Sequence, residues 1–177
     1  MRNDSDRWQP AGEALAGFAG PGVTVTPVQG RRQTLISGPV AGALAAVGLT
    51  RAHGWPEVVA AAPYALRLRR DRVLVVDGPA LPAGWDAQAG LAVSDMSDGL
   101  HIIEISGEKA FDLIRAGTEI SRADASASVV RLLAGHEVAL YFHGGGDRLR
   151  LHVSAPEAPA LMLWLRRVAG LAEEARQ

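Results

Sequence analysis

The feature that most constrains the fold is a match between two segments of the same chain. Residues 36–48 and 105–117 align without a gap, and this register pairs Ile36 with Ile105, Ser37 with Ser106, Gly38 with Gly107, Ala41 with Ala110, Leu44 with Leu113 and Gly48 with Gly117. Further along, 65–76 and 139–153 both read as β-hairpins whose second strand begins with Asp-Arg. We therefore expect a duplicated strand–helix–hairpin unit, over about 23–90 and again over about 91–170.

A strand opens the first unit. Residues 23–28 (VTVTPV) alternate in the manner of a half-buried strand. Pro27 favours an edge position for this strand, because proline has no N–H to donate to a sheet. Residues 31–37 are predicted to pair with it as a hairpin, with the turn at Gln29 and Gly30.

Each unit is then expected to continue into a short helix. In the first unit a helix over 39–47 begins with a proline and is followed by Gly48, which is the usual placement of these two residue types. The second unit repeats the pattern, with a strand over 101–106, a cap at Ser106, a helix over 108–116 and a stop at Gly117.

A longer helix is predicted near the end of the second unit. Its core-facing stripe has the i, i+3, i+4, i+7 spacing and consists of Leu161, Trp164, Leu165 and Val168. Ser154 and Glu157 offer a capping box for a helix over 157–170. Pro159 favours a start at the proline instead, because a proline further inside would clash with the preceding turn.

Two stretches lack a sustained period. Residues 1–22 are predicted to be a flexible N-terminal arm, with Trp8 and Phe18 pinning it to the domain over 23–177. Residues 77–91 read as a loop between the units, in which Trp85 is expected to fill the core.

Composition places the chain among ordinary globular proteins of the α+β class with a mainly antiparallel sheet. Its 177 residues suffice for one domain with a proper core, and 48% of them are hydrophobic. The absence of cysteine excludes disulfides and thiolate sites and fits a reducing compartment. No signal peptide or membrane span is recognisable, so a cytoplasmic location is expected. The net charge of −1 gives no general attraction to nucleic acid.

The first candidate for chemistry is His101, which follows Asp95, Ser97 and Asp98. A carboxylate beside an imidazole can orient a general base or help to hold a metal. The Ser, Asp and Gly residues of this segment also favour a turn with local hydrogen bonds. The turn explains the segment without any reaction.

A second candidate is His143, which precedes three glycines and Asp147. A glycine run binds phosphate when a helix follows it, whereas here a strand follows, so the glycines are expected to form a hairpin turn. The remaining histidines and serines offer no ligand spacing or nucleophile motif; these are His53, His136, His152, Ser121, Ser126 and Ser128. No catalytic or metal-binding residue is predicted, and cofactor-binding residues stay unknown.

Four arginines gather in one hairpin over 67–72: Arg67, Arg69, Arg70 and Arg72. The interleaved leucines indicate a strand with one solvated basic face, and charges at an edge also prevent unwanted strand pairing. An acidic protein partner or RNA are the functional alternatives, although nucleic-acid binding would normally add exposed aromatic residues.

The segment 93–117 carries a resemblance to a known family. Asp95 and Ser97 form an Asp-x-Ser turn before a strand, and a Gly-x-x-Ala helix opening with a later leucine follows at Gly107, Ala110 and Leu113. This resembles aminomethyltransferase-like folate-binding proteins. The length, the preceding half-repeat and the Trp164-Leu165 pair make the chain similar to one branch, the gamma subunits of heterotetrameric sarcosine oxidase, as a divergent member.

The resemblance implies an aminomethyltransferase-like fold and a non-catalytic accessory subunit. FAD, FMN, NAD and tetrahydrofolate would then be bound by larger alpha- and beta-like partner subunits and not by this chain alone. The alternatives are a stand-alone domain that binds a small, folate-like molecule in a concave pocket and, third, an RNA-contacting module that uses the arginine hairpin. An accessory subunit should instead leave an apolar or aromatic surface uncovered.

Overall fold

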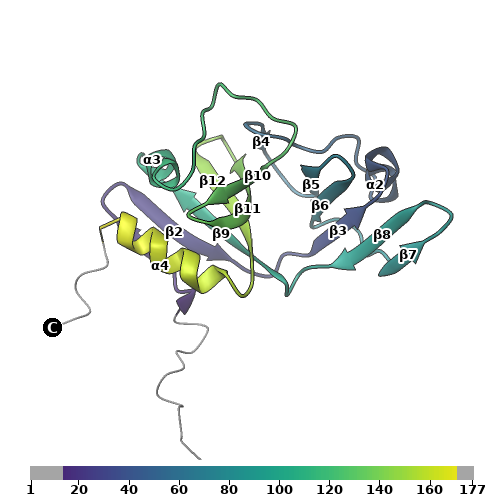
Figure 1. Cartoon of the computed structure of the whole chain (residues 1–177), viewed down its shortest axis with the longest axis horizontal. Coiled ribbons are helices and arrows are strands. Elements are labelled where there is room, and N and C mark those ends of the chain that lie inside the picture. The colour runs from purple at the N-terminus through teal and green to yellow at the C-terminus, as the bar shows by residue number, and fades with distance from the viewer. Residues whose placement is uncertain (1–13, 171–177) are drawn as a thin grey trace, which may run out of the picture.

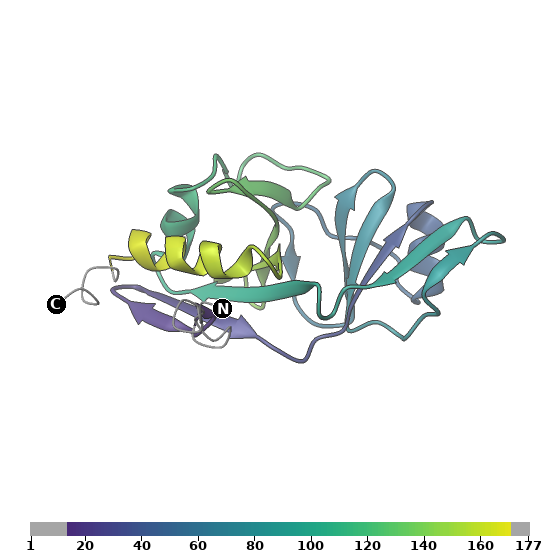
Figure 2. The same cartoon turned by 60° about the horizontal axis from the view of Figure 1, so that its bottom comes forward.

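The computed structural model describes residues 14–170 and contains two sheets that lie side by side along the molecule (Figures 1 and 2). The seven-stranded sheet has the order β1-β2-β9-β12-β11-β10, with β4 beside β11. Its strands are β1 (Phe18–Gly20), β2 (Val23–Val28), β4 (Val58–Val59), β9 (Leu100–Ser106), β10 (Val130–Leu133), β11 (His136–His143) and β12 (Arg148–Ser154). The five-stranded sheet has the order β5-β6-β3-β8-β7. Its strands are β3 (Gln33–Ser37), β5 (Tyr64–Arg69), β6 (Arg72–Val76), β7 (Gly84–Asp86) and β8 (Leu91–Asp95).

Neighbouring strands are antiparallel except for β4 and β11. The predicted mixture of α and β structure with mainly antiparallel sheets is therefore confirmed. Both predicted hairpins, β5-β6 and β11-β12, form.

Three helices cover the sheets: α2 (Val40–Ala46), α3 (Ala110–Arg115) and α4 (Ala158–Val168). Leu161 and Leu165 of α4 are buried against the seven-stranded sheet, as the spacing predicts, and Trp164 is half-buried there. Val168, the last residue of the predicted stripe, is instead 41% exposed, and Met162 is buried in addition. The expected side-chain caps are wrong, because α3 begins after Lys109 and α4 after Glu157 with no cap hydrogen bond. None of the helices in the described part of the chain is long and apolar enough to cross a membrane.

The two sheets are built from the same sequence of elements. In the five-stranded sheet β3 is followed by α2 and the β5-β6 hairpin, and β6 pairs with β3. In the seven-stranded sheet β9 is followed by α3 and the β11-β12 hairpin, and β12 pairs with β9. The aligned residues Ile36 and Ile105 are both fully buried in the two sheets. The duplication itself stays a prediction.

The first strand of each unit crosses to the other sheet. β2 precedes β3 in the chain but pairs with β9, from Thr24 opposite Ser106 to Val28 opposite Ile102. β8 precedes β9 but pairs with β3. The two connections pass each other between the sheets, in the middle of Figure 1. Each sheet is thus completed by a strand from the other half of the sequence.

The predicted hairpin between 23–28 and 31–37 is consequently wrong. Val23 and Val25 are buried in the core under α3 and α4, whereas β3 is occupied on its two edges by β6 and β8. Pro27 does lie at a local edge of the sheet, as expected, because β1 pairs with β2 only as far as Val25. Within residues 14–170, no strand pairs with β2 on that side beyond Val25.

Trp85 does not fill the core. It lies on the short edge strand β7, within the stretch predicted as a loop, and 69% of its surface is exposed. In the predicted N-terminal arm, Phe18–Gly20 forms β1 and pairs with β2, so this part is a strand. Trp8 lies outside the described residues.

Two glycines allow the exchanged strands to approach. Gly38 and Gly107, which the sequence alignment pairs, have positive φ angles of 134° and 106°. A Cβ at Gly38 would overlap the carbonyl oxygen of Gly90, the residue before β8. A Cβ at Gly107 would overlap the carbonyl oxygen of Gly22, the residue before β2. Both positions therefore require glycine for conformation and for space.

We predict that Gly38→Ala and Gly107→Ala each lower the free energy of unfolding by at least about 1–3 kcal/mol, the cost of the backbone conformation alone. Gly42→Ala is the matched control, because Gly42 lies inside α2 with open space where the Cβ would be. This control should be neutral or gain up to about 1 kcal/mol. Urea denaturation measures all three, and a Gly38 variant as stable as the Gly42 variant would contradict the prediction.

Candidate functional site

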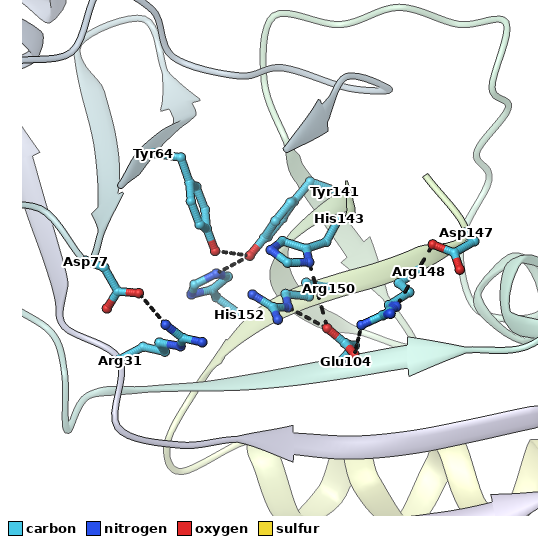
Figure 3. Close-up of polar contacts among 10 residues, drawn as sticks. All are labelled: Arg31, Tyr64, Asp77, Glu104, Tyr141, His143, Asp147, Arg148, Arg150 and His152. Atoms are coloured by element: carbon cyan, nitrogen blue, oxygen red, sulfur yellow. Dashed lines mark hydrogen bonds and ion pairs between the residues drawn. The ribbon is translucent and has the colours of Figure 1, made fainter. Parts of the chain in front are cut away.

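The sheets meet in a small core of their own. Tyr64, Leu66 and Leu74 of the five-stranded sheet pack against Ala139 and Tyr141 of the seven-stranded sheet. This junction also contains polar and titratable side chains from strands that are far apart in the sequence (Figure 3).

A chain of hydrogen bonds runs through the junction from one sheet to the other. The hydroxyl groups of Tyr64 and Tyr141 are 2.6 Å apart, and the Tyr141 hydroxyl lies 3.1 Å from Nε2 of His152. Nδ1 of His152 lies 2.6 Å from Oε1 of Gln33, whose Nε2 donates to the carbonyl of Leu100 at 2.9 Å. Gln33, Tyr64 and their partners on β11 and β12 are all buried.

The donors and acceptors of this chain have one consistent assignment. Because the amide nitrogen of Gln33 donates to Leu100, its oxygen must accept from Nδ1–H of His152. Nε2 of His152 then accepts the hydroxyl proton of Tyr141, which in turn accepts from Tyr64. A second proton on His152 would require the Tyr141 hydroxyl to turn from donor to acceptor at this nitrogen.

The environment keeps these groups uncharged. Burial, with a smaller effect from Arg150, lowers the pKa of His152 to about 3. Burial also raises the pKa of Tyr64 and of Tyr141. The chain of hydrogen bonds is therefore neutral near neutral pH and acts as a connection between the sheets.

A charged cluster lies next to this chain on the same face of the seven-stranded sheet (Figure 3). Nε of Arg150 donates to Oε2 of Glu104 at 2.8 Å, and Arg148 contacts the other carboxylate oxygen at 3.5 Å. Nδ1 of His143 lies 3.9 Å from Oε2 of Glu104 and has no hydrogen-bond partner. Burial and then Arg150 lower the pKa of His143. Glu104 is thus held as the partner of two arginines beside a neutral imidazole.

The predicted turn at Asp95 and Ser97 is confirmed. Oδ1 of Asp95 accepts from the N–H of Ser97 at 2.9 Å and from its hydroxyl at 2.6 Å, which lowers the pKa of Asp95. The Ser97 hydroxyl oxygen accepts from the N–H of Gln33 at 3.1 Å. The turn therefore fastens the start of β3. His101 lies on β9 and lines a pocket of about 200 Å³ with Ser97.

The other residues considered in the sequence, the glycines after His143, Asp147 and three serines, lie in turns and loops. Gly144 and Gly146 have positive φ angles in the turn between β11 and β12, as expected for a hairpin. Asp147 is exposed beside Arg148. The serines support the loop before β10. The backbone carbonyl of Ser121 accepts from the indole N–H of Trp55, and the backbone of Ser126 pairs with the backbone of Trp55. The hydroxyl of Ser128 donates to the carbonyl of Leu68.

Two histidines have carboxylate neighbours that the sequence does not reveal. Nδ1 of His136 lies 3.3 Å from Oε1 of Glu157, and Nδ1 of His53 lies 3.5 Å from Oε2 of Glu57. Burial lowers the pKa of His53. Within residues 14–170 no group of three or more His, Asp or Glu side chains is arranged to hold a metal ion.

The arginine hairpin is divided between two faces. Leu66 and Leu68 face the junction as predicted, but a register shift between Arg67 and Arg69 moves Arg69 to the junction side, opposite Arg72. Arg69 lies 3.3 Å from Glu137 on β11, and Arg72 donates to the hydroxyl of Ser37 at 3.1 Å.

Sequence reasoning missed the main members of the junction: Gln33, Tyr64, Glu104, Tyr141 and Arg150. The usable signal was the presence of Glu104 and Arg150 inside otherwise apolar strands, because charged residues are rarely buried without a partner. Their pairing itself depends on β9 lying beside β12.

Comparison with known proteins gives similarity in structure and none in sequence. No protein family matches the sequence, and no characterised protein matches it in sequence. The fold is similar to a chain of the heterotetrameric sarcosine oxidase from Corynebacterium sp. U-96, solved in complex with pyrrole 2-carboxylate, with a TM-score of 0.66. The match covers 97% of this chain and 99% of that chain at 17% identity, so it establishes a shared fold.

We predict that Tyr141→Phe destabilises the protein more than Tyr64→Phe. Loss of the Tyr141 hydroxyl leaves both Nε2 of His152 and the Tyr64 hydroxyl without a partner, at a cost of about 2–4 kcal/mol. Loss of the Tyr64 hydroxyl removes only the terminal donor and should cost about 1 kcal/mol. Chemical denaturation of both variants and of the double variant measures these terms. Equal losses in the two single variants would contradict the proposed order of donors.

We also predict a loss of stability in mild acid that depends on His152. Its folded-state pKa of about 3 lies below the ordinary 6.5, so the unfolded chain takes up a proton first as the pH falls. The free energy of unfolding should be fully present above about pH 6.5 and fall towards about pH 3, by up to about 1.4 kcal/mol per pH unit from this group.

His152→Gln is the variant that isolates this effect. It should be less stable than the wild type near neutral pH but lose less stability on acidification, because the other titrating groups are unchanged. Denaturation curves at a series of pH values between about 7 and about 4 give both slopes. Parallel slopes would show that His152 is not the group responsible.

Proposed function

We propose that this chain is a non-catalytic accessory, gamma-like subunit of a heterotetrameric sarcosine oxidase-type flavoenzyme, in which it packs against a larger catalytic subunit. The observation that carries the proposal is the whole-length match in both directions, 97% of this chain and 99% of the solved chain. The two chains therefore have nearly the same length, which supports equivalence to a small subunit of such an assembly.

The chemistry of the junction supports a non-catalytic role. Its imidazole, phenol and amide groups are hydrogen-bonded to one another, and its carboxylate Glu104 is engaged by Arg148 and Arg150. A general base needs a free, positioned acceptor within reach of a substrate proton. His152, the central imidazole, is 2% exposed and already accepts from Tyr141.

In the proposed assembly the redox chemistry belongs to the larger alpha- and beta-like subunits. FAD, FMN, NAD and tetrahydrofolate are bound there, and this chain contributes to the oxidoreductase complex through its surface. Trp85, 69% exposed, and Leu132, 63% exposed, are the kind of large apolar side chains that a partner subunit covers.

The alternative, a stand-alone binder of a folate-like molecule with the aminomethyltransferase-like fold, ranks second. The pocket beside His101 has a volume of about 200 Å³. Sites for drug-sized ligands usually have about 300–1,000 Å³. A folate-sized molecule therefore exceeds this pocket.

We expect the full-length chain, tagged and expressed in its native organism, to co-purify at low salt with larger chains and a yellow flavin absorbance. Mass spectrometry identifies the chains, and an absorbance spectrum detects oxidised flavin. A tag-only preparation is the control. Recovery of the tagged chain alone, colourless and monodisperse, would refute the subunit proposal.

A further inference from the structure

One face of the five-stranded sheet is only partly covered. Alternation of side chains places Ile36 and Val73 on the face that packs against α2, and Leu35 and Leu74 on the opposite face. On that opposite face the seven-stranded sheet covers β5 and β6, where Leu66 and Leu74 are 0% and 1% exposed. On β3 it reaches only the first residue, Gln33, which contacts His152. It does not extend over the rest of β3 or over β8 and β7, which lie further from it in Figure 1.

Burial along this face shows where the cover ends. Leu35 lies on β3, the central strand of the sheet, directly between Leu74 on β6 and Ser94 on β8. Leu74 is buried, Leu35 is half-buried and Ser94 is exposed. A leucine at the centre of a sheet is normally fully buried. The partial exposure of Leu35 marks an uncovered surface over β3, β8 and β7.

The last row of this face combines an arginine with a tryptophan. Cross-strand pairing puts Arg72, Ser37, Ala92 and Trp85 in one line across β6, β3, β8 and β7. Residues opposite each other in a sheet project from the same face. Ser37 and Ala92 are small, so the line is a shallow strip with a guanidinium near one end and an indole at the other.

The charges on the two faces differ in sign. Asp86 pairs with Leu91 and Asp95 with Thr34, so alternation places both carboxylates on the α2 side. On the Trp85 side the charged groups of the sheet are Arg72 and its neighbour Arg69, of which Arg69 contacts Glu137. The guanidinium of Arg72 donates to the hydroxyl of Ser37 at 3.1 Å.

We propose that this strip is a docking site for an acidic, extended protein segment, with a carboxylate on Arg72 and an apolar side chain on Trp85. Three strand spacings separate β6 from β7, which is about 14 Å. An extended chain covers this distance in about four residues. The segment therefore carries an acidic residue and an apolar residue about four positions apart.

A protein segment fits this strip better than a nucleic acid. Single-stranded nucleic acid is bound by several stacking aromatics along a positively charged groove. The strip offers one indole and one arginine, and the neighbouring Arg69 already has an acidic partner. The inference concerns the chemistry of the docked segment and holds whether or not the partner is a flavoenzyme.

Selection from a random displayed-peptide library against the full-length chain tests the proposal without a known partner. The enriched peptides should carry an acidic and an apolar residue about four positions apart. Trp85→Ala and Arg72→Gln should each weaken the best peptide at least about tenfold. The glutamine can still donate to Ser37, and an unchanged melting temperature confirms folding.

Leu132→Ala and Arg115→Gln are the matched controls, because they remove an exposed apolar side chain and a positive charge from the other sheet and its helix. They should leave the affinity within about twofold. No enrichment, enrichment of basic peptides, or equal binding to the Trp85 and Arg72 variants would overturn the proposal. So would displacement of the peptide by a single-stranded RNA oligonucleotide. None of these outcomes depends on recovery of flavin.

Discussion

The exchange of β2 and β8 between the two sheets is the constraint on which the rest of the structure depends. Each sheet is completed by a strand that the chain order assigns to the other half. The crossing connections bring Gln33, at the start of β3, against Leu100 at the start of β9 and against His152 of β12. The buried polar chain therefore joins the two sheets beside the crossing.

The hydrogen bonds of this junction fix its geometry, and they limit the protonation states that its side chains can adopt. Each buried donor has one acceptor, and an unsatisfied buried group costs about 1–3 kcal/mol. His152 must therefore stay neutral and in one tautomer, and Tyr141 must stay protonated. These requirements fix how the sheets sit on each other. They also occupy the side chains that a catalytic site in this junction would need to leave free.

Local signals were enough to predict the local elements. The hairpins over 65–76 and 139–153 and the helices after Gly38 and Gly107 depend on neighbours within a few residues, which periodicity and glycine placement reveal. The partner of β2 was not predictable in this way, because its pairing with β9 joins segments far apart in sequence and the alternation of 23–28 suits either partner. The same distance hides the contacts of His152. Trp85 was misplaced because a tryptophan in an apolar loop gives no sign of which face of an edge strand it occupies.

The two halves differ most in what covers them. The seven-stranded sheet has α3 and α4 on one face and shares its other face with the junction. Within residues 14–170 the five-stranded sheet has the seven-residue α2 on one face, and on its other face Leu35 is half-buried and Ser94 exposed. The same order of elements builds both sheets, but one sheet is covered on both faces and the other is not. The open strip therefore has no function in the isolated chain. A partner that supplies the missing cover would bury Leu35 and Trp85 as α4 buries its own sheet.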